Sequence, residues 1–371
     1  MLRTKKLHAY VVAFQAFLLF SNRLESASYA ASLALPSVKL KLVREIPHRD
    51  NIESFVFSFE GNVVATNETR YNKSNYGQCV INVWNAKAWT LQRTFSFGEA
   101  LGLSSDGRAL ITKTDNNAVL LFDTKTGKLK RALKGFRQNV VVSPNGRLMA
   151  GKTRSGAVGI WNTSTGKRLT SIRANGLGNF NYFSPDNKLL ANTNFDANAT
   201  NVTKVFKVAT GKLISSTRGF GDASAPIVFS PDKRTFLSAG TDPNWKCCPE
   251  LPQGQSYGDG GCPVDYAFKL WDVDTGKLVK AVKGARTFSD PYAPRAFLQH
   301  GKQAIYSTEY QFDVRSVTNG KLLYSGLERS SEIPGPRQRQ AISPDGSLML
   351  EFVGFGDSKT LSTLCVWKIQ Q

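Results

Sequence analysis

Residues 140–174 read VVVSPNGRLMA, GKTRSG, AVGIW, NTSTGK and RLTSIRA in succession. Apolar runs of strand length, rich in β-branched residues, alternate there with turn-rich segments. Pro144-Asn145-Gly146 and Thr165-Gly166 supply turn chemistry, because proline presets φ and glycine accepts a positive φ. The stretch therefore predicts a meander of four antiparallel strands.

The same unit recurs along most of the chain. Its first turn has copies that begin at Ser58, Ser104, Ser143, Ser184, Ser230, Gln299 and Ser343. A second mark, usually aromatic, follows each of these anchors: Trp84, Phe122, Trp161, Phe206, Trp271, Arg315 and Trp367. In five units a Gly-Lys pair begins five residues after that mark, at Gly127, Gly166, Gly211, Gly276 and Gly320. Marks that stay in step along the chain indicate a repeat architecture.

These repeats resemble the WD-repeat β-propeller family. The resemblance rests on the Ser-Pro-Asp-Gly turns, on the segment Trp271-Asp-Val-Asp-Thr-Gly-Lys277, and on near copies at 122–128 and 161–167. No unit has the Gly-His pair that the family often places before its first strand. The resemblance covers about residues 38–371 and implies an all-β fold, a seven-bladed propeller of four-stranded antiparallel blades.

The ring must also close. The last unit stops at Trp367-Lys-Ile-Gln-Gln371 without a fourth strand, and residues 38–44 (VKLKLVR) offer a spare one. We therefore expect the amino-terminal strand to complete the carboxy-terminal blade, which removes two open sheet edges. Residues 31–371 are then one propeller domain.

Residues 1–30 predict a secretory signal peptide cleaved near Ala30. The basic start at Arg3, Lys5 and Lys6 precedes an apolar stretch that is short for a membrane span. An uncleaved anchor or a disordered leader is the alternative. Cleavage would make the protein secreted or periplasmic, and no later segment is apolar and long enough to span a bilayer.

A cysteine-, glycine- and proline-rich insertion occupies residues 240–266 in blade five. Loops of this length are usually functional or disordered. A disulfide from Cys247 or Cys248 to Cys262 would order it, and an exported protein permits one. A zinc knuckle is the alternative, but no histidine lies nearby, so we expect no metal. Cys79 and Cys365 fall in neighbouring blades out of register, which favours two buried free thiols.

The formal net charge of +20 implies affinity for polyanions or anionic surfaces. In a meander, the connections between strands one and two and between strands three and four emerge on one face, here called the first face. The other connections emerge on the second face. We expect lysines of the Gly-Lys turns on the first face, where a merely solvated role is the simpler interpretation. His48 and an arginine-rich set interleaved with aromatics are expected on the second face, and a binding site there is weighed evenly against a solvated face. The candidate binding residues are Arg49, Phe136, Arg137, Arg218, Phe220, Arg286, Arg295, Arg337 and Arg339.

The chain lacks familiar catalytic patterns. With three histidines, a histidine-based triad or a multi-histidine metal site is not expected. We therefore expect an exported, non-enzymatic binding or scaffold module, a monomer without cofactor. Its partner would be a protein or a polyanion, such as a polysaccharide, a phospholipid surface or an acidic protein.

Two other functions stay open. The first is a hydrolase-like propeller enzyme with its site at the channel mouth, where Asp222, Asp290, Glu328 and Glu332 are the nearby acids. The second is a nucleic-acid-associated scaffold, which requires that the leader stays uncleaved. Asn-x-Ser/Thr triplets begin at Asn67, Asn72, Asn162, Asn198 and Asn201, of which all but Asn162 are expected in second-face loops; they matter only in a eukaryotic secretory pathway.

Overall fold

The computed structural model describes most of the chain after residue 38. The described residues are 39–48, 50–71, 77–96, 98–114, 116–173, 177–195, 200–221, 227–241, 264–287, 293–307, 311–327, 340–353 and 362–370. The leader, residues 242–263 with Cys247, Cys248 and Cys262, and the acids at 222, 290, 328 and 332 lie outside them. Residues Val38–Gln371 form one compact unit.

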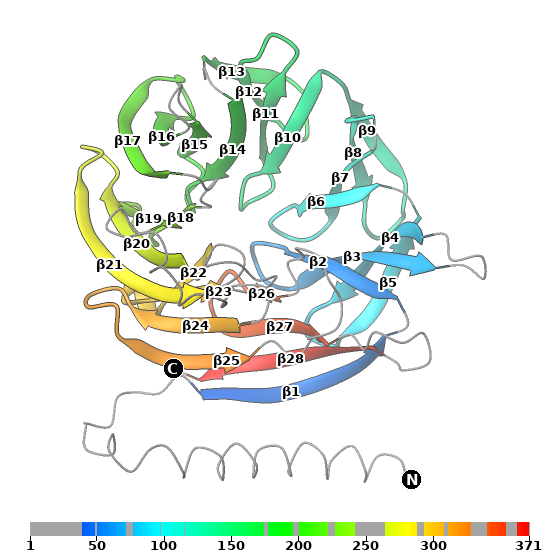
Figure 1. Ribbon diagram of the computed structural model, residues 1–371. Helices are drawn as coiled ribbons and strands as arrows, with labels where there is room; N and C mark the ends of the chain where they lie inside the picture. The colour runs from blue at the N-terminus through cyan, green and yellow to red at the C-terminus, as the bar shows by residue number, and fades with distance from the viewer. Residues whose placement is uncertain are drawn as a thin grey trace, which may run out of the picture. The chain divides into compact units, whose positions relative to one another are not determined.

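Seven four-stranded antiparallel sheets are arranged around a common centre, as the sequence predicts (Figure 1). Blade one consists of β2 (Asn51–Phe57), β3 (Val63–Tyr71), β4 (Gly77–Asn85) and β5 (Thr90–Phe95). Blade two consists of β6 (Glu99–Leu103), β7 (Ala109–Lys113), β8 (Val119–Asp123) and β9 (Leu129–Leu133). Blade three consists of β10 (Phe136–Val142), β11 (Leu148–Thr153), β12 (Val158–Asn162) and β13 (Arg168–Ile172). Blade four consists of β14 (Leu177–Phe183), β15 (Leu189–Phe195), β16 (Thr200–Lys207) and β17 (Leu213–Gly221).

The remaining three blades continue the same order. Blade five consists of β18 (Ile227–Phe229), β19 (Thr235–Thr241), β20 (Val264–Asp272) and β21 (Leu278–Thr287). Blade six consists of β22 (Ala293–Leu298), β23 (Gln303–Ser307), β24 (Gln311–Ser316) and β25 (Leu322–Leu327), and the degraded anchor forms the 3-10 turn η1 (Gln299–Gly301). Blade seven consists of β26 (Gln340–Ile342), β27 (Leu348–Val353), β28 (Ser362–Gln370) and β1 (Lys39–His48).

The amino-terminal strand closes the ring. β1 pairs antiparallel with β28 from Lys39 opposite Gln370 to His48 opposite Ser362. Figure 1 shows β1 as the outer strand of the blade that the chain's last strands begin. The predicted closure is therefore confirmed, and the first and last strands of the described chain are held in one sheet.

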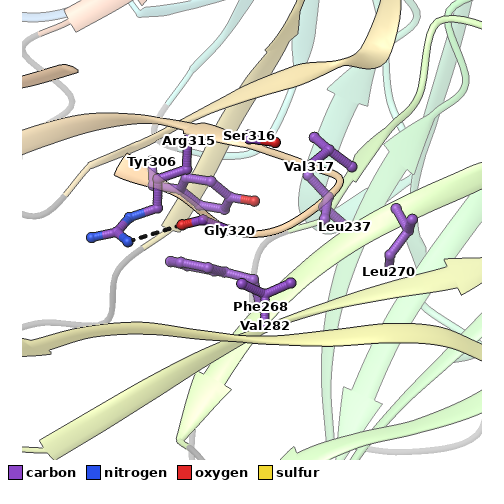
Figure 2. Close-up of a pocket in the computed structure, with 9 residues that line it drawn as sticks. All are labelled: Leu237, Phe268, Leu270, Val282, Tyr306, Arg315, Ser316, Val317 and Gly320. Carbon is purple, nitrogen blue, oxygen red and sulfur yellow. Dashed lines mark hydrogen bonds between the residues drawn. The ribbon is translucent and has the colours of Figure 1, made fainter. Parts of the chain in front are cut away.

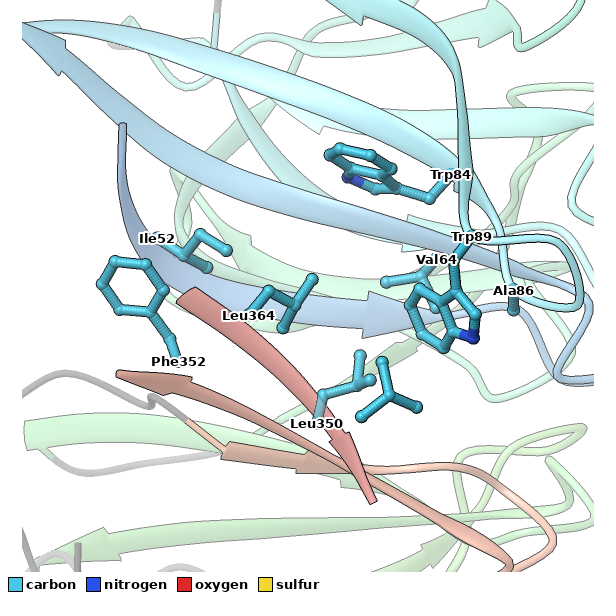
Figure 3. Packing of buried hydrophobic residues seen from close by; sticks show 9 residues of the cluster. Ile52, Val64, Trp84, Ala86, Trp89, Leu350, Phe352 and Leu364 are labelled. Carbon is cyan, nitrogen blue, oxygen red and sulfur yellow. The ribbon is translucent and has the colours of Figure 1, made fainter. Parts of the chain in front are cut away.

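The hydrophobic core lies between blades. Seven clusters of buried hydrophobic residues form among the described residues, and each combines side chains of two neighbouring blades. At the closure, Trp84 and Trp89 of blade one pack with Leu350, Phe352 and Leu364 of blade seven (Figure 3). The aromatic marks therefore serve packing, as expected, because each contributes to the contact with the preceding blade.

Two of the loops in which second-face Asn-x-Ser/Thr triplets are expected are largely strand. In blade one Asn67 lies within a hairpin, because β3 pairs with β4 from Val63 opposite Asn85 to Tyr71 opposite Gly77. In blade four, β15 and β16 likewise pair out to Phe195 opposite Asn201. Polar residues at the hairpin ends gave these segments the composition of a loop, although cross-strand hydrogen bonds satisfy their backbones.

Both described cysteines are thiols outside any disulfide, as expected, but only Cys365 is buried. The prediction that Cys79 is buried is wrong. β5 pairs with β4 only from Ile81 onward, so the start of β4 has no outer neighbour to cover Cys79. No helix of the described residues has the length and apolar character to cross a bilayer.

Candidate binding surface

The anchor turns fix the backbone of the first face. In blade two the Ser104 hydroxyl donates to Asp106 Oδ1 (2.7 Å), and the same carboxylate oxygen accepts the Arg108 backbone N–H (3.0 Å). Neighbouring turns are also joined, because the Ser105 N–H donates to the Asn145 carbonyl of blade three (3.1 Å). The turns of blades two and three are therefore hydrogen-bonded to each other rather than being separate loops.

Aspartates of these turns are held ionised. The pKa of Asp106 is lowered by the Ser104 hydroxyl first and by the Arg108 N–H second. The pKa of Asp232 is lowered in the same way by Ser230 and by the Arg234 N–H. For Asp345, burial is the largest single effect and acts to raise the pKa, but hydrogen bonds from Ser343 and Ser347 outweigh it and the pKa is lowered. The carboxylates of these aspartates accept hydrogen bonds within their own turns.

The Gly-Lys hairpins shape the outer part of the same face. Asp123 Oδ1 accepts the Thr126 N–H (2.7 Å), and the Gly127 N–H donates to the Asp123 carbonyl (2.8 Å). Gly127 adopts φ +73°, which a side chain would strain, and the following Lys128 is turned outward. Asn162 and Asp272 organise the hairpins of blades three and five with the same bonds.

Five exposed lysines follow from this repeated hairpin. They occupy the same position in consecutive blades: Lys128, Lys167, Lys212, Lys277 and Lys321. No ion pair to any of the five is found among the described residues, whereas Arg70, Lys113 and Arg315 are paired with carboxylates elsewhere. The first face therefore presents cations whose charge is not neutralised locally.

Other cations on the outer strands bind neighbouring blades. Arg93 of β5 donates to the carbonyls of Thr124 (3.2 Å) and Lys125 (2.7 Å) in the hairpin of blade two. Arg131 of β9 donates to the Ser164 carbonyl of blade three (2.9 Å). Each outer strand is thus tied to the next hairpin, which keeps the hairpins fixed relative to one another.

The predicted second-face residues are only partly described. Arg218 and Arg295 are exposed, on β17 and β22. Arg137, Phe220 and Arg286 lie in β10, β17 and β21, and their side chains are outside the description. Arg49, Arg337 and Arg339 are outside the described residues altogether. The described residues therefore do not test whether these nine candidates form one site, and the set stays a prediction.

Phe136 belongs to the core. Its side chain is 6% exposed and lies against Trp161, with ring centroids 4.3 Å apart. The expectation that it interleaves with surface arginines is wrong, because Phe136 begins β10 and faces blade two's packed side. Asn67 is corrected in the same way: its amide donates to Ser54 Oγ and to the Ala100 carbonyl, so this buried sequon is inaccessible to a glycan.

His48 is also inside the protein. Its Nε2 lies 3.1 Å from Glu68 Oε1, and both side chains are almost fully buried. Glu68 further accepts hydrogen bonds from the Thr66 hydroxyl and the Asn82 amide, and Trp84 Nε1 donates to Thr66 Oγ1 (3.1 Å). This polar network couples the closing strand β1 to blade one. The sequence predicts His48 on the second face, in a connection between blades. That prediction is wrong, because β1 continues to His48 and its side chain is buried.

A small pocket lies between blades five and six (Figure 2). Phe268 and Tyr306 stack there with centroids 3.8 Å apart, and Arg315 takes the place that tryptophan or phenylalanine has in the other blades. Arg315 forms an ion pair with buried Asp313 (2.8 Å) and donates to the Gly320 carbonyl (3.3 Å). Its guanidinium is therefore committed to holding blade six together.

The described residues contain no group of three or more His, Cys, Asp or Glu side chains that could hold a metal ion. A scan against protein-family models finds no family that matches the chain. The arrangement that remains is a rigid ring whose first face carries regularly placed, unpaired lysines.

Proposed function

We propose that this protein is an exported, non-enzymatic binding or scaffold module that presents a basic surface to an anionic partner. The observation that carries the proposal is the set of five exposed, unpaired lysines at the same hairpin position, on a ring closed by β1. A rigid scaffold lowers the entropic cost of binding, because the cations are already in place before a partner arrives.

We further propose that the chain is a divergent member of the WD-repeat family. The support is the Trp271-to-Lys277 hairpin and its copies, together with the packing of the marker tryptophans between blades. In blade five the Trp271 indole donates to Ser238 Oγ (2.9 Å), so the marker residue is anchored to the neighbouring strand as well as packed.

Export is part of the proposal and has its own test. The leader's basic start and apolar stretch support cleavage near Ala30. Expression in a secreting host followed by amino-terminal sequencing of the product is expected to give a chain beginning at Ala31. A chain that retains the leader would remove export and favour an intracellular role.

The functional experiment is retention of the chain Ala31–Gln371 on an immobilised polyanion across a salt gradient. The comparison is a variant with Arg137, Arg286, Arg295, Arg337 and Arg339 changed to glutamine, which removes the predicted second-face site. Strong retention that is lost in this variant would place the partner on the second face. Strong retention that survives would move the partner to the Gly-Lys turns of the first face or show that the charge acts diffusely.

Elution of both proteins near physiological salt would end the proposal of an anionic partner. A contact made through phosphates or sulfates must weaken steeply with salt, because binding releases condensed counterions. In that outcome the expected partner is a protein that recognises the shape of the loops rather than their charge.

A further inference from the structure

The positive charge is concentrated in one part of the ring. Residues 124–221 contain 17 Lys and Arg against two Asp, a net charge of +15 out of the chain's +20. This segment runs from the outer hairpin of blade two through all of blades three and four, which are consecutive in the ring (Figure 1). Blade three (136–173) has seven Lys and Arg and no acid. We call residues 124–221 the basic sector.

Part of the charge of the basic sector lies on the first face. Seven of its cations lie in or directly beside the two kinds of turn, have exposed side chains, and form no ion pair among the described residues: Lys125, Lys128, Arg147, Lys167, Lys188, Lys207 and Lys212. They come in pairs or threes from three successive blades, so they follow an arc along the face. Arg131 and Arg168 extend the arc onto the exposed outer strands.

The one described carboxylate in the basic sector is already engaged. Asp186 accepts hydrogen bonds from the Ser184 hydroxyl (2.7 Å) and the Lys188 N–H (3.1 Å), and Lys233 Nζ of blade five lies 3.5 Å from it. The turns of the first face outside the sector carry more acidic residues. These are Glu60, Asp106, Asp232, Asp272, Asp274 and Asp345. Asp123, which opens the hairpin of Lys125 and Lys128, is paired with Lys130 (2.8 Å), so the seven cations have no carboxylate partner among the described residues.

The uncharged surroundings narrow the class of partner. The hairpin tips of the sector expose Thr126, Ser164, Thr165 and Thr210, and no described aromatic side chain of residues 124–221 is exposed. Of the usual anchors of protein interfaces only arginine is exposed here, without tryptophan or tyrosine, and single-stranded nucleic acid needs aromatic stacking platforms. A bilayer surface would favour apolar side chains at the tips, which here are small and polar.

The exposed leucines of the sector do not change this conclusion. Leu129, Leu169 and Leu213 begin or nearly begin the outer strands, behind the hairpin tips. Leu91, Leu278 and Leu322 repeat the same exposed position in blades outside the sector. The exposed leucine is thus a feature of every blade that repeats this hairpin. The excess of cations, by contrast, is found only in the part of the chain from the outer hairpin of blade two to blade four.

We infer that the first face of the basic sector is a binding site for an extended anionic polysaccharide, one whose sulfate or carboxylate groups pair with the arc of lysines. The polymer's hydroxyl groups match the serine and threonine hydroxyls of the tips, and a flexible chain can follow an arc across three blades. This inference rests on the proposed function and adds to it the place of the site and the class of its ligand.

The test uses two variants with equal loss of charge. The sector variant carries Lys128→Gln, Lys167→Gln, Lys188→Gln and Lys212→Gln. The matched control carries Lys87→Gln, Arg108→Gln, Arg234→Gln and Lys302→Gln, which are exposed first-face cations outside the sector and outside the set of five hairpin lysines. Affinity for a heparin oligosaccharide is measured at about 0.15 M salt, beside dextran, a single-stranded oligonucleotide and phosphatidylserine vesicles. A thermal melt of each variant checks that the ring is intact.

We expect the sector variant to lose at least about tenfold in affinity for heparin while the control stays within about threefold of the unchanged chain. Equal losses in both variants would overturn the inference, because the charge would then act diffusely, and would leave the proposed function standing. Tighter binding of the oligonucleotide or the vesicles than of heparin would overturn the ligand class. If no polyanion binds the unchanged chain, the proposed function fails together with the inference.

Discussion

At the residue scale, the same turn can be spacious in one blade and crowded in the next. Gly61 and Gly146 occupy equivalent anchor turns and both have φ +69°. A Cβ on Gly61 would meet nothing within 4 Å, whereas one on Gly146 would lie 2.4 Å from the Leu103 carbonyl oxygen and 2.5 Å from Ser104 Cα. The backbone of blade two at Leu103 and Ser104 therefore packs directly against the anchor turn of blade three.

This pair gives the first prediction. Gly61→Ala is expected to cost about 1 kcal/mol, the strain of alanine at positive φ. Gly146→Ala carries the same strain and must also displace the backbone of blade two, so it is expected to cost at least about 2 kcal/mol more. Urea unfolding of both variants measures the difference. Equal losses of stability would contradict the close packing of these two blades.

The buried network around Glu68 gives the second prediction. Glu68→Ala leaves His48 and the Asn82 amide without this acceptor, whereas the Thr66 hydroxyl keeps the Asn82 carbonyl (3.3 Å). Each buried donor left unpaired costs about 1–3 kcal/mol, so the loss of unfolding free energy is expected to be about 2 kcal/mol or more. Glu99→Ala is the control, since Glu99 is 56% exposed and its ion pair with Lys113 is worth at most about 1 kcal/mol. A Glu68 variant as stable as the control would show that the network contributes little.

Residue-level burial was the hardest property to predict from the sequence. Phe136 and His48 both stand next to turn-like residues, and alternation within one blade does not show what the adjacent blade covers. The excess of lysine and arginine over residues 124–221 was present in the sequence throughout. It was missed because the charges were sorted by face and not by blade.

At the scale of the element, the anchor turn uses either Asp or Asn. Asn145 in blade three accepts the Ser143 hydroxyl (2.9 Å) and the Arg147 N–H (3.1 Å), as Asp106 does in blade two with its own neighbours. The turn therefore keeps its hydrogen bonds without a charge. The aspartate versions differ in titrating, because their pKa values are lowered in the folded protein.

This difference gives the third prediction. A carboxyl group whose pKa is lower in the folded than in the unfolded chain stabilises the fold above its unfolded pKa of about 3.9, and that contribution is lost as pH falls through the folded pKa. The double variant Asp106→Asn and Asp232→Asn is therefore expected to lose less melting temperature than the unchanged chain between about pH 5 and pH 3. The same drop in both proteins would show that these two turns do not contribute to acid sensitivity.

Elements were predicted well where turn chemistry was explicit. The Ser-anchored turns and the Gly-Lys hairpins located the boundaries of strands such as β11 (Leu148–Thr153) and β12 (Val158–Asn162). Prediction failed at the β3–β4 and β15–β16 hairpins, where asparagine, threonine and arginine occupy paired positions. At the far end of these hairpins the strands are held by backbone hydrogen bonds between polar residues. The sequence there therefore lacks the apolar alternation that predicts a strand.

At the scale of the whole molecule, closure by β1 makes the ring one cooperative unit. β1 buries Leu40 against the contact of blades six and seven and Ile46 against that of blades seven and one. Without it, β28 becomes an open edge and blade seven has three strands. The spare strand and the incomplete last unit were both visible in the sequence, so this feature could be predicted before the structure.

Removal of this strand gives the fourth prediction. Deletion of residues 37–45 is expected to abolish the cooperative thermal transition, because two blade contacts and a strand pairing are lost together. The control is the chain Ala31–Gln371, which keeps β1 and is expected to melt cooperatively. A truncated chain that retained the full transition at the control's temperature would contradict closure by β1.

The most direct test of the account is the affinity of the chain Ala31–Gln371 for one defined heparin oligosaccharide at a series of salt concentrations. If several cations of the first face pair with the charges of the polymer, the logarithm of the association constant is expected to fall linearly with the logarithm of salt concentration. The slope is about 0.7–0.9 for each charge contact and therefore several units in total. A slope near zero, or no binding at low salt, would contradict the claim that this propeller presents its basic face to an anionic partner.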